Sequence, residues 1–349
     1  MGWLQERLYT RKLSFSQALA LSPLALIVPL FAGLAALRRL AYRRGWLQSF
    51  ALPVPVIVIG NLTVGGAGKT PLTLWCAQSL QEAGWRPGIV SRGYGGSHQH
   101  PLPVTPESSP EKIGDEPVLL ARQSRLPVWV GQDRVAAAHA LLKAHPQVNL
   151  LICDDGLQHY RLKRDAEIVV FDGRGAGNGH LLPLGPLREP LTRARRVQAL
   201  VFNGTPDARV LKSAPQIPHY AMRLKAAPFY RLEQPQIRAT AAELRQRDAG
   251  KTLHALAGIG DPPRFFRTLS ELGLVFTAHP FPDHHNYRAA DLAFCAAGEI
   301  LLMTEKDAVK CARLSLSGAP EIWVLPVAAE LPPELTHILL ETIHGRKTA

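Results

Sequence analysis

The 349-residue sequence has few cysteines, no internal repeat and no low-complexity run. Its four cysteines, Cys76, Cys153, Cys295 and Cys311, lie far apart and form no Cys-x-x-Cys pair. This argues against a disulfide framework and against a structural zinc site. Each cysteine lies among apolar residues, so we expect buried thiols in a reducing compartment. Apolar residues make up 46% of the chain and charged residues 19%, which is typical of a globular protein and not of a disordered one.

Acidic residues are in the minority, with 28 Asp and Glu against 40 Lys and Arg, so the formal net charge is +12. Such a balance favours an anionic partner: a phosphorylated substrate, a nucleic acid or an acidic membrane face. The length is enough for about two domains with a large buried core.

Charged residues are absent from positions 13–37, and positions 18–37 are nearly all apolar. We interpret this segment as a membrane-embedded or membrane-facing amphipathic helix whose flanking arginines lie on lipid phosphates. A cleaved signal peptide, a spanning helix and a pair of core helices are the alternatives, and Pro23 and Pro29 disfavour a straight span. The aromatic residues expected near the membrane interface are Trp3, Tyr9, Tyr42 and Trp46.

A glycine-rich turn follows the apolar run at 56–61 and precedes a helical pattern. Its residues are Thr63, Val64, Gly65, Gly66, Ala67, Gly68, Lys69 and Thr70. Glycines let successive backbone N–H groups point at phosphate oxygens, and the helix N-terminus adds positive potential. Lys69 would reach the outer phosphates and the Thr70 hydroxyl would hold Mg²⁺. Thr63 stands where the usual pattern has glycine, so an ordinary glycine-rich turn is the alternative. A nucleotide site requires cytoplasmic ATP, which disfavours the signal peptide.

Strand and helix patterns alternate after this turn, as they do in a parallel sheet. We expect strands at 56–61, 89–91, 128–130, 150–153, 168–171 and 199–203, and helices at 69–83, 115–123 and 133–143. The predicted fold class is α/β: a P-loop NTPase-like parallel sheet with helices on both faces, a smaller C-terminal α/β domain and the N-terminal apolar helix. Strands of the smaller domain are expected at 252–257, 274–277, 300–303 and 322–325. The predicted division is 1–50 for the membrane-associated segment, 51–225 for the P-loop core and 226–349 for the smaller domain.

Polar residues follow two of the expected strands, at the edge where open α/β sheets bind ligands. Asp154 and Asp155 end the strand at 150–153, a position from which a carboxylate holds Mg²⁺ through its water shell. A polar turn is the alternative. Arg92 and Tyr94 follow the strand at 89–91, with Arg92 suited to a phosphate and Tyr94 to a sugar face, and a glycine turn is the alternative.

Further polar residues have two possible roles each. Asp115 is either a helix N-cap or a carboxylate that takes a proton from an acceptor hydroxyl. His284, in the polar segment 281–287, is either a lone acid–base histidine across a cleft or part of a surface loop. Adjacent histidines cannot both face one point on regular structure, which argues against a metal site there. Thr304 is expected to cap a helix, and no further role is assigned to the segment 304–307.

Six motifs occur in a specific order along the chain. They are Gly60-Asn61-Leu62-Thr63-Val64-Gly65-Gly66-Ala67-Gly68-Lys69-Thr70-Pro71, Ser91-Arg92-Gly93-Tyr94-Gly95, Gly114-Asp115-Glu116-Pro117, Asp154-Asp155-Gly156-Leu157-Gln158-His159, Pro186-Leu187-Arg188-Glu189 and Asp283-His284-His285. Together they resemble the tetraacyldisaccharide 4'-kinase family of lipid A (lipopolysaccharide) biosynthesis, over nearly the whole chain. The family's phosphate loop has the form found at Thr63, whereas Leu157 stands where the family usually has phenylalanine.

The resemblance implies ATP-dependent phosphorylation of the 4'-hydroxyl of a tetraacylated glucosamine disaccharide 1-phosphate, which forms lipid IVA. It places the reaction at the cytoplasmic face of the bacterial inner membrane and implies ATP and Mg²⁺ as cofactors. By the family's pattern, Asp115 is the base, assisted by His284 once two domains close, and Lys69 neutralises the β and γ phosphates. The implied metal ligands are Thr70, Asp155 and Glu189, and the implied substrate-binding residues are Arg92, Tyr94, Asp154 and Arg188.

Two other classes of nucleotide-binding protein fit parts of the sequence. A membrane-associated ATPase of the partitioning type would carry a second lysine where this chain has Val64. A nucleic-acid-binding NTPase would show a compact basic stripe or interleaved aromatic residues, whereas many arginines here flank the apolar segment or the proline-rich loop at 182–190. We therefore expect the lipid A disaccharide 1-phosphate and the inner-membrane lipid surface as partners, with no nucleic acid and no obligate protein partner.

Overall fold

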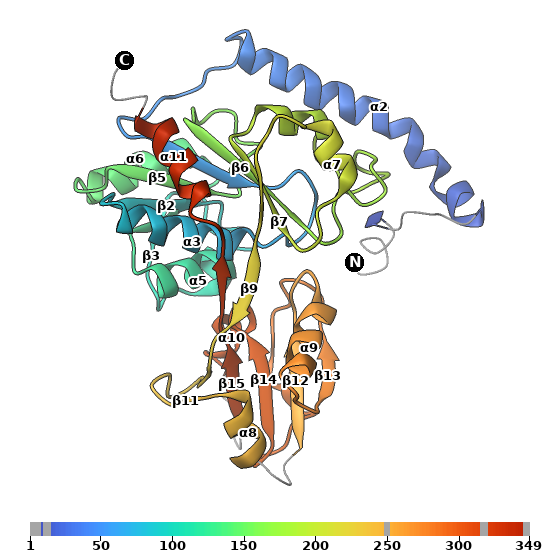
Figure 1. The fold of residues 1–349 in the computed structure, drawn as a ribbon, viewed down its shortest axis with the longest axis vertical. Helices are drawn as coiled ribbons and strands as arrows, with labels where there is room; N and C mark the ends of the chain where they lie inside the picture. Colours follow the sequence, from blue (N-terminus) through green and yellow to red (C-terminus); the bar gives the residue numbers. More distant parts are fainter. Residues whose placement is uncertain (1–7, 10–14, 248–251, 315–319, 345–349) are drawn as a thin grey trace.

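The structure, a computed structural model, describes residues 8–9, 15–247, 252–314 and 320–344. It consists of two α/β lobes, one above the other in Figure 1, joined by a narrow two-stranded ribbon. The ribbon pairs β9 (Arg223–Ala226) with β16 (Val327–Glu330) in antiparallel fashion. The predicted α/β class is therefore confirmed.

The first lobe is built on an eight-stranded sheet. Its strands, in spatial order, are β3 (Leu102–Val104), β4 (Val128–Val130), β2 (Pro87–Ser91), β5 (Leu150–Asp154), β1 (Val56–Gly60), β6 (Ala166–Asp172), β7 (Ala199–Asn203) and β8 (His219–Ala221). Neighbouring strands are parallel except β3 and β4. All six strands expected for this lobe are present within a few residues of their predicted ends, whereas β3 and β8 were not predicted.

Helices cover both faces of this sheet, because the strands are buried on both sides and point alternate side chains into two cores. The helices of the lobe are α3 (Lys69–Glu82), α4 (Pro110–Ile113), α5 (Asp115–Ser124), α6 (Arg134–Ala144), the 3-10 helix η1 (Leu191–Arg196) and α7 (Ala208–Ser213). Ile57 of β1 packs with Leu72 of α3 in one core, and Val58 packs with Leu141 of α6 in the other.

The second lobe has a six-stranded sheet. Its spatial order is β11 (Arg238–Ala239), β10 (Phe229–Arg231), β15 (Glu321–Leu325), β14 (Ile300–Thr304), β12 (Leu253–Ala257) and β13 (Thr277–Pro280), with helices α8 (Ala241–Arg247), α9 (Pro262–Glu271), η2 (Ala289–Leu292) and α10 (Glu305–Cys311). The strand expected at 274–277 was misplaced: Leu274 is buried in the core as the chain leaves α9, Val275 is 88% exposed, and the strand begins at Thr277.

The last helix, α11 (Glu334–His344), returns to the first lobe (Figure 1). Leu335, Leu339 and Ile343 are fully buried there, in the core that contains Ile57. The end of the chain thus packs with the first lobe, although the predicted third segment included it. The boundaries at 50 and 225 stay predictions.

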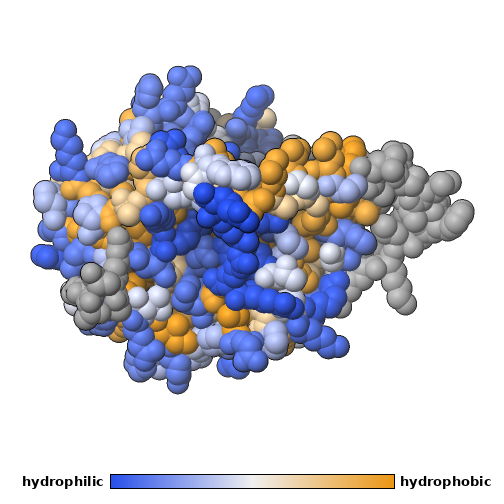
Figure 2. All heavy atoms as spheres, turned by 90° about the horizontal axis from the view of Figure 1, so that it is seen from above, coloured by the Kyte–Doolittle hydropathy of each residue, from blue (hydrophilic) through white to orange (hydrophobic). Residues whose placement is uncertain are grey.

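The apolar N-terminal segment forms one helix, α2 (Phe15–Arg43), which runs through both prolines and lies along the upper edge of the first lobe (Figure 1). Ile27, Leu30, Leu34 and Leu37 are each about half exposed on its outer surface. Figure 2 shows these hydrophobic side chains gathered along the helix beside strongly hydrophilic ones. Among the residues that the structure describes, no helix has both the length and the apolar character needed to cross a lipid bilayer.

The aromatic residues expected at a membrane interface differ in position. Trp46 is 67% exposed, and the Tyr42 ring lies 5.9 Å from that of Tyr160. Tyr9 instead points at the phosphate loop, where its hydroxyl donates a hydrogen bond to the Val64 carbonyl. The prediction that Tyr9 lies at a membrane interface was therefore wrong, and Trp3 lies outside the described residues. All four cysteines are free and buried, as expected.

Candidate active site

The glycine-rich turn joins β1 to α3, so that Lys69 and Thr70 are the first two residues of the helix. Gly68 caps the helix with φ 91°, and a Cβ atom there would lie 2.4 Å from the Asn203 side chain, so only glycine fits. Thr63 forms an antiparallel bridge with Leu187 in the proline-rich loop. This position needs a strand-like backbone rather than a glycine, which accounts for the threonine.

The second lobe lies directly against this turn. The guanidinium of Arg174 donates to the Gly66 carbonyl at 3.2 Å and to the Gly260 carbonyl, across the lobe boundary, at 3.4 Å. Arg264 of α9 donates to Asn203 at 2.6 Å, and Asn203 donates to the Ala67 carbonyl at 3.3 Å. The conformation of the turn therefore depends on both lobes.

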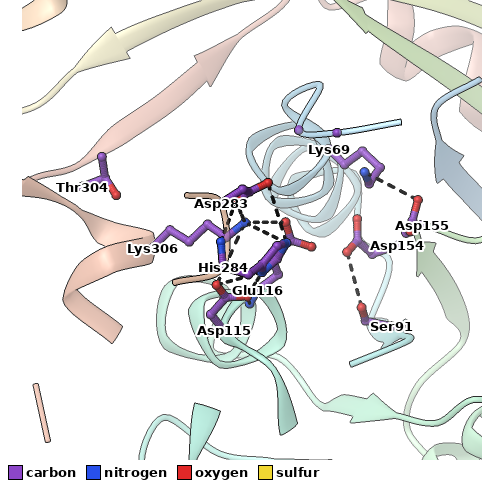
Figure 3. Close-up of polar contacts among 12 residues, drawn as sticks. Lys69, Ser91, Asp115, Glu116, Asp154, Asp155, Asp283, His284, Thr304 and Lys306 are labelled. Carbon is purple, nitrogen blue, oxygen red and sulfur yellow. Dashed lines mark hydrogen bonds and ion pairs between the residues drawn. The ribbon is translucent and has the colours of Figure 1, made fainter. Parts of the chain in front are cut away.

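Two acidic residues lie beside the turn, Asp154 at the end of β5 and Asp155 directly after it (Figure 3). Nζ of Lys69 lies 3.5 Å from Oδ1 of Asp155, and Arg188 lies at the same distance from that oxygen. Burial opposes ionisation of Asp155, but the charges of Lys69 and Arg188 outweigh it and lower the pKa of this carboxyl. Asp155 is thus an ionised oxygen donor next to the hydroxyl-bearing first turn of α3, a donor set that suits Mg²⁺.

Asp154 is fully buried behind Asp155. Its carboxylate accepts hydrogen bonds from Thr73 at 3.1 Å and Ser91 at 3.4 Å, and so joins α3 to the end of β2. Burial and the charge of Glu116 raise the pKa of Asp154. Its predicted contact with substrate stays a prediction, and its burial favours a supporting role.

The structure brings Asp115 and His284 together from different lobes (Figure 3). Nδ1 of His284 lies 3.2 Å from both carboxylate oxygens of Asp115. Burial opposes ionisation of Asp115, but the hydrogen bond from His284 and the charges of Lys306 and Lys310 lower its pKa to about 2. Burial also acts to lower the pKa of His284, and the hydrogen bond to Asp115 outweighs it, so the net shift is upward.

One interpretation of the sequence made Asp115 a helix N-cap, and the structure shows that it is not. Gly114, with φ 98°, is the cap residue, and Asp115 is the first residue of α5. Because a positive φ suits glycine best, Gly114 takes the cap position and the helix begins at Asp115, the first residue of the predicted range 115–123. The carboxylate is consequently free to face His284 across the lobe boundary.

Lys306 of α10 is a site residue that the sequence analysis missed. Its Nζ lies 3.0 Å from Asp283, 3.2 Å from Glu116 and 3.4 Å from Nε2 of His284 (Figure 3). Burial opposes its charge, but Glu116, Asp115 and Asp283 outweigh it and raise the pKa of this amine. The signal was present: lysines at 306 and 310 lie four residues apart on a helix that Thr304 caps, as expected.

Asp307 holds this part of the second lobe in place. It is fully buried, accepts hydrogen bonds from the Gly258 N–H at 3.1 Å and the Tyr287 hydroxyl at 2.9 Å, and pairs with Lys310 at 3.1 Å. Lys310 in turn lies 3.9 Å from Asp115. Two lysines on α10 thus approach the same carboxylate.

The other predicted site residues lie around this centre. Arg92 and Tyr94 are exposed, and the Tyr94 ring lies 5.1 Å from that of His284. Glu189 is buried elsewhere: its carboxylate accepts from the Tyr160 hydroxyl at 2.5 Å and pairs with Arg39 at 3.4 Å and Arg193 at 3.7 Å. The structure therefore places Glu189 among cations, and its predicted metal role stays a prediction.

A phosphate-binding turn between a parallel strand and a helix, with ionised carboxylates facing it, defines an α/β nucleotide-binding protein of the P-loop class. Residues 17–344 match the family described as tetraacyldisaccharide-1-P 4'-kinase. The chain belongs to this family.

Individual relatives agree with that assignment. The tetraacyldisaccharide 4'-kinase of Dechloromonas aromatica is 54% identical over 99% of both chains, and that of Methylobacillus flagellatus is 50% identical over 89% of this chain and 88% of its own. Among solved structures, the "apo" form of LpxK from Aquifex aeolicus in complex with ATP is similar, with a TM-score of 0.74 and 29% identity. That similarity covers 93% of this chain and 98% of the other.

Proposed function

We propose that this chain transfers the γ-phosphoryl group of ATP to the 4'-hydroxyl of a tetraacyldisaccharide 1-phosphate and so forms lipid IVA. The observation that carries the proposal is the pairing of Asp115 with His284 beside α3, the helix whose first residue, Lys69, faces Asp155 (Figure 3). Family membership supports the kinase activity, and the ATP complex of the Aquifex relative supports the nucleotide.

The glycine-rich turn and Lys69 bind the β and γ phosphates in this proposal. Mg²⁺, held by Thr70 and Asp155, supplies neutralisation of the developing charge on the phosphate oxygens when bound. Asp155 keeps its charge because Lys69 and Arg188 lower its pKa, so an oxygen ligand is present at neutral pH. Arg188, which lies 3.5 Å from Asp155, would bind an anionic group of the substrate.

Asp115 is the proton acceptor for the 4'-hydroxyl. Its pKa of about 2 makes it a weak base, but one that is always ionised at neutral pH. Phosphoryl transfer passes through a loose transition state, in which positioning and charge neutralisation contribute more than strong base catalysis. His284 orients the carboxylate through Nδ1, while Lys306 holds the Nε2 side of the same ring.

A substrate with four acyl chains requires access to a membrane, and α2 supplies the surface for it. Ile27, Leu30, Leu34 and Leu37 form an exposed apolar stripe, while Arg39 on the same helix faces Glu189 of the lobe. We place the protein at the cytoplasmic face of the bacterial inner membrane, bound through this stripe and the nearby arginines. The lipid disaccharide would then reach Arg92 and Tyr94 from the membrane side.

A transfer assay tests the proposal. Full-length protein is incubated with γ-labelled ATP, Mg²⁺ and tetraacyldisaccharide 1-phosphate in detergent, with the Asp155→Asn variant as the comparison. We expect label on the lipid with the parent protein and a loss of about 100-fold or more with the variant. Hydrolysis of ATP with no label on the lipid would overturn the proposal, and stimulation of that hydrolysis by DNA or RNA would favour a nucleic-acid-dependent NTPase instead.

A further inference from the structure

A second cluster of potential metal ligands lies in the second lobe, away from the active site. A ring nitrogen of His254, Sγ of Cys295 and a carboxylate oxygen of Glu299 all lie within 4.8 Å of one another, and Nε2 of His254 lies 3.4 Å from Glu299. His254 is near the start of β12, and Glu299 directly precedes β14. His284, which pairs with Asp115, instead follows the end of the neighbouring strand β13, and Thr304 is the last residue of β14. The cluster therefore lies at the opposite edge of the sheet and takes no part in phosphoryl transfer.

The His254 ring is oriented as a metal ligand would be. Its Nδ1 lies 2.9 Å from Nε2 of His279, on the adjacent strand β13. When Nδ1 donates this hydrogen bond, the lone pair of the other ring nitrogen is free, and a partner of this kind is what orients metal-binding histidines. That second nitrogen is buried and faces the Glu299 carboxylate at 3.4 Å, but it makes no hydrogen bond to the part of the chain that the structure describes. A buried polar atom of this kind is costly unless something binds it.

The other two ligands are also fixed in place. The Glu299 carboxylate accepts a hydrogen bond from the Ala296 N–H at 2.6 Å, and its nearer oxygen lies 3.4 Å from Nε2 of His254. Cys295 is 5% exposed, whereas the Glu299 side chain is 28% exposed and leaves a route for an ion from solvent. Metal–ligand bonds of about 2.0–2.3 Å require ligand atoms roughly 3.3–3.8 Å apart in a tetrahedron, so a small contraction of the cluster suffices.

We propose that His254, Cys295 and Glu299 bind a zinc-class divalent ion, with His279 orienting His254. Nitrogen, sulfur and oxygen ligands together favour Zn²⁺ over Mg²⁺ or Ca²⁺, which prefer oxygen alone. The fourth position belongs to water. The ion ties the starts of β12 and β14 to the segment between η2 and β14, and its function is structural. The absence of a Cys-x-x-Cys pair gave no sign of it, because the ligands come from positions that only the fold brings together.

Metal binding by the full-length protein tests the site. The protein is stripped with a chelator, dialysed and titrated with Co²⁺ and then Zn²⁺, with the absorption spectrum as the readout. We expect one Co²⁺ per chain with an intense thiolate charge-transfer band, displaced by one Zn²⁺. Cys295→Ser loses the band and weakens Zn²⁺ binding by about 100-fold or more, while His279→Ala weakens it by about 10- to 100-fold. Cys311→Ser, a buried cysteine of the same lobe, retains both.

Several outcomes would overturn the proposal: no thiolate band in the parent protein, a band that survives in Cys295→Ser, or a band lost in Cys311→Ser. Should Cys295→Ser fail to fold, Glu299→Gln provides the test, because its more exposed side chain tolerates substitution. That variant keeps the thiolate band and binds Zn²⁺ at least about 10-fold more weakly if the proposal is right. Unchanged affinity in Glu299→Gln would contradict it.

Discussion

Nδ1 of His284, in the second lobe, lies 3.2 Å from each carboxylate oxygen of Asp115, in the first lobe. The two residues are 169 positions apart, so their contact depends on how the lobes meet. Lys306 lies against both of them and against Asp283 and Glu116, which makes one network across the lobe boundary.

The pairing of Asp115 with His284 predicts non-additive losses of activity. Asp115→Ala and His284→Ala are each expected to lower kcat by about 100-fold or more, because one removes the proton acceptor and the other its orientation. The double variant should be little worse than Asp115→Ala alone, since the two side chains act together. Initial rates of label transfer at saturating ATP measure this, and losses that multiply would show that the residues act independently.

Lys306→Met should shift the pH dependence of the reaction. The charge of Lys306 lowers the pKa of both Asp115 and His284. Its removal raises both values, so the acidic limb of the kcat/KM profile moves to higher pH. Loss of its contacts with Asp283 and His284 should also lower the rate at neutral pH by roughly 10-fold. Lys306→Arg, which keeps the charge, should recover part of the rate. Lys143→Met, at an exposed position on α6, is the matched control, and an unmoved profile in Lys306→Met would exclude this positioning role.

Gly260→Ala tests the contact between the second lobe and the phosphate loop. A Cβ atom at Gly260 would lie 2.9 Å from the Gly66 backbone nitrogen, so the loop has to shift. Because catalysis is sensitive to displacements well below 1 Å, we expect a fall in kcat/KM for ATP of about 10-fold or more. Gly173→Ala, where a Cβ meets nothing within 4 Å, should leave it unchanged. Equal kinetics in both variants would mean that the loop position does not depend on this contact.

Glu305→Gln should alter how stability depends on pH. Burial raises the pKa of Glu305 to about 7, above its value of 4.5 in an unfolded chain. The folded state therefore binds the proton more tightly, and the free energy of unfolding falls as pH rises from about 4.5 to about 7.

Between pH 5 and pH 8 the free energy of unfolding should fall by about 2 kcal/mol more in the parent than in the glutamine variant. Each pKa unit corresponds to about 1.4 kcal/mol, and the value is reduced because the side chain is only partly buried. Urea unfolding at the two pH values measures the difference. Glu330→Gln, an exposed position on β16, should behave as the parent does. If the free energy of unfolding of Glu305→Gln falls with pH as much as that of the parent, another group causes the decline.

The apolar stripe on α2 should carry membrane binding. Replacing Leu30, Leu34 and Leu37 together with serine should weaken binding to vesicles of anionic phospholipid by about 100-fold or more, because burial of each leucine contributes on the order of 1–2 kcal/mol. Val275→Ser removes an apolar side chain of the second lobe that is 88% exposed and serves as control. Co-sedimentation with vesicles measures both variants. Equal binding by both would place the membrane contact elsewhere.

Much of the fold was predictable because its signals are local. The central strands of the first sheet are buried on both faces and appear in the sequence as continuous apolar runs such as Val56–Gly60. The phosphate-binding turn follows from its own glycines and the lysine after them. In contrast, β3 and β8 were missed because they are short and partly exposed, and their pairing depends on neighbours far along the chain.

The sequence by itself determined which chemical groups are present: the phosphate loop, a carboxylate at the end of β5, and a carboxylate and a histidine suited to proton transfer. Only the tertiary structure decided which of them meet. It put Lys306 beside Asp115 and His284, placed Glu189 among Arg39, Tyr160 and Arg193, and turned Tyr9 towards the phosphate loop. These contacts join residues from separate elements and from both lobes. They arise from the packing of the elements against one another, which local periodicity and spacing do not encode.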